Sequence, residues 1–299
     1  MQTKNLNKNY GITDQLVFTT DQSDFIYANI QTAQASATIS LYGGQVLSYK
    51  PANASDDLMF LSEHAYYKKG KAIKGGIPIC WPWFGADPEG KGRPAHGFAR
   101  NSEWTVLETA VEKNGSIRLS LELNLNDTTR KLWEGDISAR LDVVAGDNLA
   151  LTLTTFNNSK DEMQLTQALH TYFNVGDSTQ VSVTGLGGKT YLDKADGGGE
   201  RIQQGPVTIS GEVDRIYTDI NNDLVIHDSV LERKIRIQSN GSASAVVWNP
   251  WKEIAAEMGD LGDTDYLRML CVETTNAGPD IVTIAPGDPY KLSAVYRVE

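Results

Sequence analysis

The chain has 299 residues, with 27 Lys and Arg against 38 Asp and Glu, so its formal net charge is −11. This acidic balance disfavours a nucleic-acid or anionic-membrane partner, because such partners are bound by neutralising their phosphates with cations. At 40% hydrophobic and 22% charged residues, the composition provides enough apolar material for a core and excludes wholesale disorder.

Alternation of apolar and polar residues with a period of two dominates the chain and predicts β-strands. The clearest run covers residues 117–125. The same pattern at 137–143 and 149–153 flanks the turn residues AGDN, which predicts a hairpin. Strands at this density indicate antiparallel sheets. Further short strands are predicted at 181–183, 207–209, 235–237, 281–284 and 290–298.

Helical signals are few. One turn is predicted at 127–133 and another at 253–258, and neither is long enough for the crossover of a βαβ unit. No repeat of fixed period and no Pro/Ser-rich linker divides the chain. We therefore expect an all-β fold, a large antiparallel β-sandwich of two packed sheets, as one domain over residues 1–299.

Targeting and redox features are equally sparse. Residues 1–10 are polar and no apolar segment follows them, which is not typical of a secretory signal. No stretch approaches the ~18 apolar residues of a membrane span. Cys80 and Cys271 lie far apart in apolar runs, in neither a disulfide framework nor a CxxC motif. These features predict a cytoplasmic protein with no membrane partner.

Motifs for several common chemistries are missing from the sequence. The run Gly188-Lys189-Thr190 ends like a phosphate-binding loop, but Val183 stands where that motif requires glycine. There is no GxSxG elbow, HExxH helix or EF-hand loop. Hydrolase, zincin, calcium-binding and dinucleotide-binding functions are therefore disfavoured.

The four histidines differ in their surroundings. His64 and His227 lie beside charges and turn formers, so we expect solvated or structural roles for them. His170 lies in LTQALHTYF, where a strand would place it on one face with a threonine, an alanine and a tyrosine. These neighbours leave room for a ligand. From the residues alone, a hydrogen-bonded core histidine and a catalytic histidine remain equally open.

Glu273 directly follows the apolar run at 267–272. Desolvation there would favour the neutral carboxyl and raise its pKa, so that it could act as a base near neutral pH. The alternative is an ion pair at a strand end with Arg268.

Two segments gather residues suited to a binding wall. Residues 71–85 combine paired glycines, which permit close backbone approach, with prolines that fix a rigid path. In residues 94–101, His96 and Arg100 are four residues apart with a glycine between them, and one loop could present both. For Arg100 the alternative is a surface ion pair.

Seven stretches together resemble the glucose-6-phosphate 1-epimerases, the hexose-6-phosphate mutarotase branch of the aldose 1-epimerase family. They follow the family's order from about residue 41 to the C-terminus, so the resemblance covers most of the chain. The stretches are GGQVLS at 43–48, GGIP with WPWFG at 75–85, HGFARN at 96–101, LHTYF at 169–173, DRIY at 214–217, VWNPW at 247–251 and CVE at 271–273.

The resemblance implies a galactose-mutarotase-like supersandwich that binds the sugar on a concave sheet face. It implies that His170 is the general acid and Glu273 the general base in opening and reclosing a cyclic aldose, a reaction that needs no cofactor and no metal. His96 would contact the sugar, and Asp214 would hydrogen-bond hydroxyls or orient a histidine.

The resemblance also implies a sugar-phosphate substrate. Arg100 matches a position that binds the 6-phosphate and offers a bidentate fork. Lys74 matches a site often occupied by arginine. Lysine keeps the positive charge but cannot donate the two parallel hydrogen bonds of a guanidinium. The residues Thr274-Thr275-Asn276 after Glu273 depart from the Pro-Gly of some members.

We therefore expect an isomerase that interconverts the α and β anomers of glucose 6-phosphate, as a monomer with a small-molecule sugar phosphate as its partner. Two alternatives stay open. One is a mutarotase for unphosphorylated glucose or galactose, which gains weight if Lys74 and Arg100 point away from the pocket. The other is a non-catalytic sugar-phosphate-binding protein, favoured if His170 and Glu273 are too far apart to serve one sugar.

Overall fold

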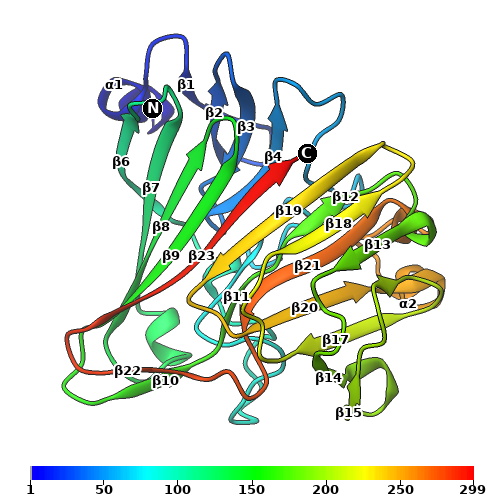
Figure 1. Cartoon of the computed structure of the whole chain (residues 1–299). Coiled ribbons are helices and arrows are strands. Elements are labelled where there is room, and N and C mark those ends of the chain that lie inside the picture. Colours follow the sequence, from blue (N-terminus) through cyan, green and yellow to red (C-terminus); the bar gives the residue numbers. More distant parts are fainter. Residues whose placement is uncertain (1) are drawn as a thin grey trace.

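The computed structural model describes residues 2–299. Most of its strands form two large sheets, and every pairing between named strands is antiparallel. Figure 1 shows β19 and β18 passing in front of β21 and β20, one sheet stacked on the other. The antiparallel sandwich expected from the sequence is confirmed.

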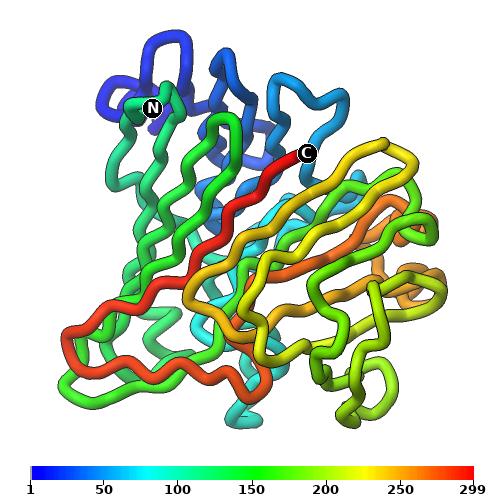
Figure 2. Tube along the Cα trace, viewed as in Figure 1, coloured from blue at the N-terminus to red at the C-terminus, as the bar shows by residue number. Residues whose placement is uncertain are grey.

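The larger sheet has nine strands, and Figure 2 traces its C-terminal strand in red through the middle of it. In sheet order the strands are β16 (Val207–Thr208), β13 (Val181–Thr184), β18 (Leu224–Asp228), β19 (Arg233–Asn240), β23 (Pro289–Val298), β9 (Leu149–Asn157), β8 (Ile137–Ala145), β7 (Ile117–Asn124) and β6 (Thr105–Val111).

The second sheet has eight strands and carries most of the predicted site. In order they are β15 (Gly199–Ile202), β14 (Thr190–Asp193), β17 (Val213–Tyr217), β20 (Ser244–Asn249), β21 (Met269–Asn276), β11 (Gln167–Leu169) and β5 (Ile79–Cys80), with β12 (Tyr172–Asn174) also pairing with β21.

Smaller elements complete the fold. A four-stranded sheet precedes the large ones, and isolated bridges such as Val46 with Ile77 join it to the eight-stranded sheet. Its strands are β1 (Leu16–Thr20), β2 (Ile26–Gln31), β3 (Ala35–Ser40) and β4 (Gln45–Pro51), and a separate pair is β10 (Met163–Leu165) with β22 (Val282–Ile284). The helices are α1 (Gln2–Tyr10) and α2 (Trp251–Glu257), with short 3₁₀ turns η1 (Ala99–Asn101), η2 (Thr129–Lys131), η3 (Ser178–Gln180), η4 (Lys194–Asp196) and η5 (Asp265–Leu267).

The alternating sequence pattern builds the core between the sheets. Leu121, Leu141, Leu153 and Leu292 lie side by side across four neighbouring strands, and none is exposed. Burial of each such side chain stabilises the fold by roughly 1.5–3 kcal/mol. The predicted strand at 117–125 and the hairpin at 137–153 are confirmed as β7 and as β8 with β9.

The helices differ from the sequence expectations. The turn expected at 127–133 is the shorter η2, and that expected at 253–258 is α2, which begins two residues earlier. The helix α1 was not predicted, because it is polar and buries no residue. It is held by Asn7, whose side-chain amide donates to the Phe18 carbonyl (2.8 Å) and accepts from the Phe18 N–H (2.7 Å), and by the partly buried Leu6 and Tyr10, which pack against the core. No helix within residues 2–299 has the length and apolar character needed to cross a bilayer.

Candidate functional site

A cavity of about 510 Å³ lies on the face of the eight-stranded sheet that is turned away from the core, and all six residues predicted for the site line it. Those residues are Lys74, His96, Arg100, His170, Asp214 and Glu273. A larger hollow of about 640 Å³ lies between α1 and the strands β1 to β3. Asp14 is the one ionisable residue of its described lining, whereas the smaller cavity combines two histidines with carboxyl groups and cations.

The strand β21 supplies Glu273 by simple alternation. Leu270 and Val272 belong to the core between the sheets, whereas Cys271 and Glu273 lie on the opposite face, because successive side chains of a strand point to opposite sides. Glu273 lies opposite Val246 of β20 in the middle of the sheet and is only 2% exposed. The carboxylate is therefore held on a rigid element.

His170 comes from a break between two short strands rather than from one continuous strand, which corrects the sequence expectation. The Thr171 N–H donates to the Leu169 carbonyl (2.9 Å), a bond typical of a tight turn. The His170 N–H donates to the Pro78 carbonyl (3.0 Å). This turn separates β11 from β12 and fixes the backbone that carries the imidazole.

The two groups predicted for catalysis are in contact. His170 Nε2 lies 3.5 Å from Glu273 Oε1, and His170 is 7% exposed. Burial raises the pKa of Glu273 well above its usual value, and nearby Asp214 acts in the same direction. Burial lowers the pKa of His170 well below its usual value, with further lowering by His96 and Arg100. Desolvation disfavours both charged forms. Burial of the pair therefore favours a neutral imidazole and a neutral carboxyl.

His96 lies in a strained loop against the same pair. Its φ is +64°, and its ring meets that of His170 edge-on at 5.6 Å between centroids. The Gly85 N–H donates to His96 Nδ1 (3.3 Å), which leaves the proton of the neutral imidazole on Nε2. The next residue must be glycine, because a Cβ at Gly97 would lie 2.0 Å from the Trp81 carbonyl oxygen.

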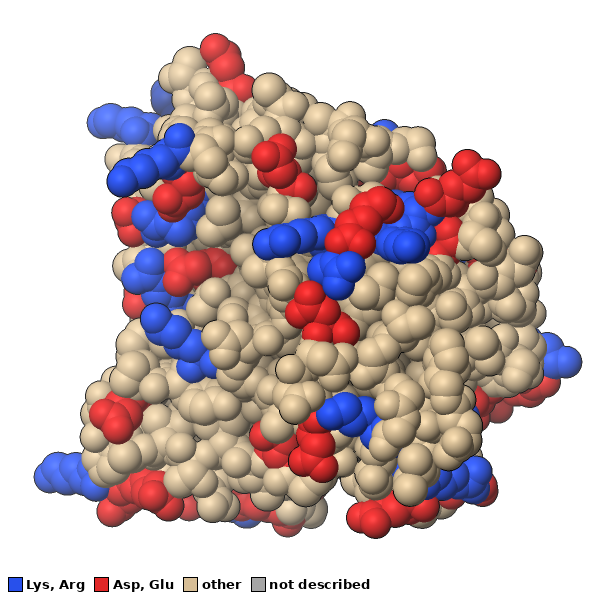
Figure 3. Space-filling view, viewed as in Figure 1, with Lys and Arg blue, Asp and Glu red and all other residues tan. Residues whose placement is uncertain are grey.

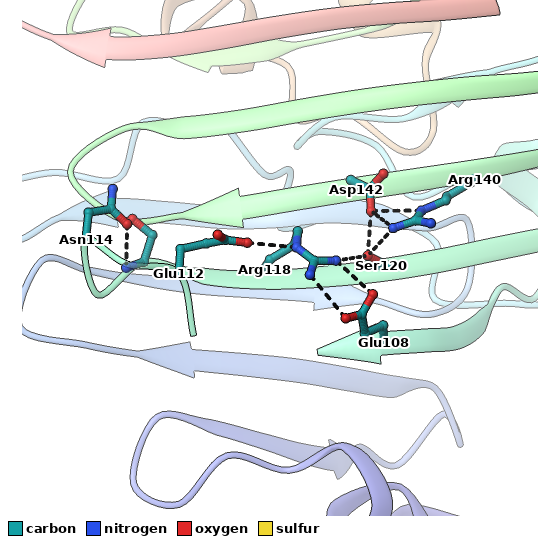
Figure 4. A network of polar contacts seen from close by, with 8 residues as sticks. Glu108, Glu112, Asn114, Arg118, Ser120, Arg140 and Asp142 are labelled. Carbon is teal, nitrogen blue, oxygen red and sulfur yellow. Dashed lines mark hydrogen bonds and ion pairs between the residues drawn. The ribbon is translucent and has the colours of Figure 1, made fainter. Parts of the chain in front are cut away.

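Arg100 is a cation without a carboxylate partner in the described part of the chain. Its Nη2 donates to the Ala95 carbonyl (3.0 Å), and its buried Nε makes no hydrogen bond. The surface ion pair that was the alternative for Arg100 is not found. The outer face of the nine-stranded sheet shows the contrast, because there Arg118 donates to both Glu108 and Glu112 (Figure 4). Arg100 therefore keeps donor capacity for an anion in the cavity.

Lys74 also lines the cavity, but it has a partner. Its Nζ lies 3.4 Å from Asp260 Oδ1, and both side chains are about one-fifth exposed, at 17% and 21%. The charge available to an anion is thus weaker here than at Arg100. On the face shown in Figure 3, acidic and basic side chains are interspersed, so any attraction for an anion there would be local rather than spread over a basic surface.

Asp214 lies on β17 opposite Trp248 and lines the cavity. Burial raises its pKa, and Lys194 opposes that shift. Within residues 2–299 it makes no hydrogen bond to either histidine of the cavity, so the structure gives no support to a histidine-orienting role. Its side chain remains available to hydroxyl groups of a ligand.

Sequence reasoning missed several contributors to the cavity wall, among them Tyr172, Lys194 and Trp248. The Tyr172 ring stacks on that of His170 at 4.9 Å, and Trp248 meets both rings edge-on. Both aromatic residues lie in the quoted stretches LHTYF and VWNPW, which were the available signal. Lys194 lies in η4 with no motif around it.

A protein-family model described as Aldose 1-epimerase matches residues 28–297. A protein of Escherichia coli (strain K12), provisionally named a glucose-6-phosphate 1-epimerase, is 37% identical over 93% of this chain and 91% of its own length. A protein of the plant Cenchrus ciliaris with the same provisional name is 37% identical over 87% of this chain and 81% of its own. The chain belongs to the aldose 1-epimerase family.

A solved structure agrees with this assignment. A Salmonella typhimurium protein provisionally described as a mutarotase superposes with a TM-score of 0.89 at 32% identity, over 97% of this chain and 95% of that one. This aldose 1-epimerase is therefore an isomerase with the mutarotase-like sandwich, and its substrate class is a sugar.

Two further expectations are settled by the geometry of this aldose 1-epimerase. Arg268 pairs with Asp265 (2.6 Å) and not with Glu273, so the strand-end ion pair that was the alternative for Glu273 is not found within residues 2–299. Cys80 lies opposite Ala168 of β11, which in turn lies opposite Thr275 of β21. Two strand spacings of ~4.8 Å exceed the ~7 Å that a disulfide can span, so Cys80 and Cys271 cannot be joined.

Cys271 has a different neighbourhood, next to the acid–base pair. The ligand atoms of His170, Cys271 and Glu273 all lie within 4.8 Å of one another, and all three residues are buried. Among the described residues, this group has a spacing that could hold a metal ion; His170 and Glu273 line the cavity, and Cys271 does not.

The burial of His96 predicts a pH-dependent stability. Burial, together with Arg100 and Lys74, lowers the pKa of His96 from 6.5 to about 3. As pH falls through this window, the unfolded chain takes up a proton that the folded chain does not, so stability is lost. Relative to His96→Gln, the wild type should lose about 1 kcal/mol of unfolding free energy between pH 6 and pH 5.

Urea unfolding at the two pH values measures this difference. His64→Gln replaces an exposed histidine and serves as the control. Unfolding free energies of wild type and His96→Gln that change in parallel with pH would contradict a buried, neutral His96.

Proposed function

We propose that this aldose 1-epimerase interconverts the α and β anomers of glucose 6-phosphate and related hexose 6-phosphates. The observation that carries the proposal is that one cavity holds both a buried His170–Glu273 pair and the guanidinium of Arg100, which no carboxylate of the described residues neutralises. The provisional names of the relatives, which share 37% of their aligned residues with this chain, support the same substrate.

His170 and Glu273 would exchange two protons with the sugar. In the buried pair the proton lies on Glu273, and its transfer to His170 Nε2, 3.5 Å away, gives the carboxylate and imidazolium that start the reaction. Glu273 then takes the proton of the C1 hydroxyl while His170 gives a proton to the ring oxygen, so that the ring opens to the aldehyde. Rotation about the C1–C2 bond and the reverse transfers close the other anomer. The raised pKa of Glu273 makes it a stronger base and the lowered pKa of His170 makes it a stronger acid. Both groups become neutral in the ring-opened state, which burial favours.

The remaining side chains would hold the sugar in place. The neutral His96 offers its Nε2–H to a sugar oxygen, and the half-buried Asp214 accepts from hydroxyl groups. Tyr172 and Trp248 provide aromatic surface beside the ring. Confining the open chain preserves the geometry for reclosure.

The phosphate would be bound by Arg100, with Lys74 and Lys194 as further cations of the cavity. A guanidinium can donate two parallel hydrogen bonds to a phosphate. Arg100 suits this role because its Nε makes no hydrogen bond within residues 2–299. The chemistry of the pair itself needs neither a cofactor nor a metal.

One observation favours a second candidate, a mutarotase for unphosphorylated aldoses. Asp260 partly neutralises Lys74 at 3.4 Å, which weakens the phosphate site. The orientation of Arg100 in the cavity favours the phosphorylated substrate.

We also propose that residues 1–299 act as one domain and as a monomer. The continuous core, which joins Ile39, Leu141 and Val272 of three different sheets, supports the single domain.

The acid–base pair predicts the effect of two substitutions. Glu273→Gln and His170→Asn should each lower kcat for anomer exchange by about 10²–10⁴-fold, because each removes one proton-transferring group and leaves a polar side chain in its place. Glu253→Gln, at an exposed glutamate of α2, is the control and should keep wild-type kcat. Wild-type turnover in a folded Glu273→Gln variant would remove Glu273 from the mechanism.

The phosphate contact predicts a substrate-dependent effect at Arg100. Arg100→Ala should raise KM for glucose 6-phosphate by about 10- to 100-fold, the loss expected for charge-assisted hydrogen bonds, and should change KM for glucose little. Arg130→Ala, at an exposed arginine, provides the matched control. An equal rise for both sugars would show that Arg100 does not bind the phosphate.

A further inference from the structure

Three kinds of metal ligand come together beside the cavity: His170 and Glu273 line it, and Cys271 belongs to the buried apolar cluster with Tyr172 and Met269. The imidazole of His170, the thiol of Cys271 and the carboxyl of Glu273 have ligand atoms within 4.8 Å of one another. Zn²⁺ is bound in proteins by this combination of nitrogen, sulfur and oxygen donors, usually in a tetrahedron. We propose that Zn²⁺ binds these three side chains and thereby inhibits the enzyme.

The spacing suits a tetrahedral ion. Metal–sulfur and metal–nitrogen bonds of ~2.3 and ~2.0 Å place two ligand atoms of a tetrahedron about 3.5 Å apart. His170 Nε2 and Glu273 Oε1 already have this separation of 3.5 Å. The sulfur needs to approach by at most about 1.3 Å, within reach of a side-chain rotation. The fourth position faces the cavity, through which the ion enters.

The backbone keeps the three donors together. Cys271 and Glu273 are two residues apart on β21 and so share one face of the sheet. Cys271 lies opposite Tyr172 of β12, and His170 precedes that strand by two residues. Two donors thus come from one strand and the third from the turn before its neighbour.

Unsatisfied polar atoms point to a ligand at this place. Glu273 Oε2 and His170 Nδ1 are buried and make no hydrogen bond within residues 2–299. A buried polar atom without a partner costs about 1–3 kcal/mol. A cation that also bonds to Glu273 Oε2 would remove that cost, whereas His170 Nδ1 keeps no partner when Nε2 is the ligand. The thiol of Cys271 lies outside the proposed proton transfers, so the reaction does not explain why it adjoins the pair.

The donor atoms of the site, and not the charge of the cavity, decide which cations bind. Lys74, Arg100 and Lys194 line it as well, so a cation is held by bonds to its donors and not by the surrounding field. Mg²⁺ and Ca²⁺ prefer oxygen ligands and gain little from sulfur or imidazole. Zn²⁺ and Cd²⁺ should therefore bind, whereas Mg²⁺ and Ca²⁺ should not.

Inhibition rests on the proposed function, because the ion would occupy the His170 and Glu273 atoms that exchange protons with the sugar. Metal binding itself does not depend on it. The two can be separated by measuring binding and activity on the same protein.

The two cysteines provide a matched test, since both are fully buried and free. Calorimetric titration of the whole protein with Zn²⁺ should give one site, and Co²⁺ should give a thiolate charge-transfer band. Cys271→Ser should weaken Zn²⁺ binding at least about 100-fold, since even outer partners of metal ligands are worth ~10–100-fold. Cys80→Ser should bind like the wild type. Cys271→Ala is the second variant if the serine does not fold.

The second measurement is the effect of Zn²⁺ on enzyme activity. Zn²⁺ should inhibit wild type and Cys80→Ser reversibly, with EDTA restoring activity, and Cys271→Ser should resist at least about 100-fold more Zn²⁺. Absence of a Zn²⁺ site in the wild type, or equal losses in both cysteine variants, would overturn the proposal. Binding that depends on Cys271 but leaves activity intact would overturn the inhibition and place catalysis outside His170 and Glu273.

Discussion

The contact between His170 and Glu273 is the constraint on which the rest of the site depends. Two ionisable side chains, 7% and 2% exposed, meet at 3.5 Å on a sheet face that excludes most water. Their charged forms lose hydration and gain only one mutual contact, so burial shifts the pKa of each toward the neutral form. The same desolvation that destabilises the pair increases its acid and base strength. Reactivity here is therefore a consequence of where the sheet places these groups.

The fold tolerates the unfavourable desolvation of His170 and Glu273 because the other face of the eight-stranded sheet packs into the apolar core. β21 turns Leu270 and Val272 toward the core and Cys271 and Glu273 to the opposite face, where Glu273 lines the cavity. Opposite it, leucines such as Leu141 pack without exposure in the nine-stranded sheet. One strand thus anchors the layer and presents the carboxyl group. A loop could not hold the carboxyl group of Glu273 with the same rigidity, since its backbone lacks the ladder of hydrogen bonds on both sides.

Much of the fold could be predicted because strand alternation is a local property. The hairpin at 137–153 was predictable from its apolar period and its turn residues, whereas α1 was not, because it has no apolar stripe and depends on Asn7 bonding to Phe18. The break at His170 was also hidden. The break follows from two backbone hydrogen bonds, one from His170 to Pro78 and one from Thr171 to Leu169. No pattern in the stretch LTQALHTYF predicts them.

The residues of the site were predictable through family resemblance, but their partners were not. The pair Lys74–Asp260 depends on where the loop after α2 returns to the sheet. The position of Lys194 in the cavity depends on the short turn η4 after β14. The approach of Cys271 to His170 and Glu273 needs the register of β12 against β21. These are long-range contacts, which a local period cannot encode.

Two-dimensional exchange NMR of glucose 6-phosphate and of free glucose, each with and without the purified protein, tests the central claim most directly, because it follows anomer exchange without a coupling enzyme. The pair of His170 and Glu273 beside Arg100 predicts strongly enhanced exchange of the phosphorylated sugar and much weaker enhancement for glucose. Equal enhancement of both sugars would contradict the role of Arg100. No enhancement of either would contradict catalysis by the buried pair.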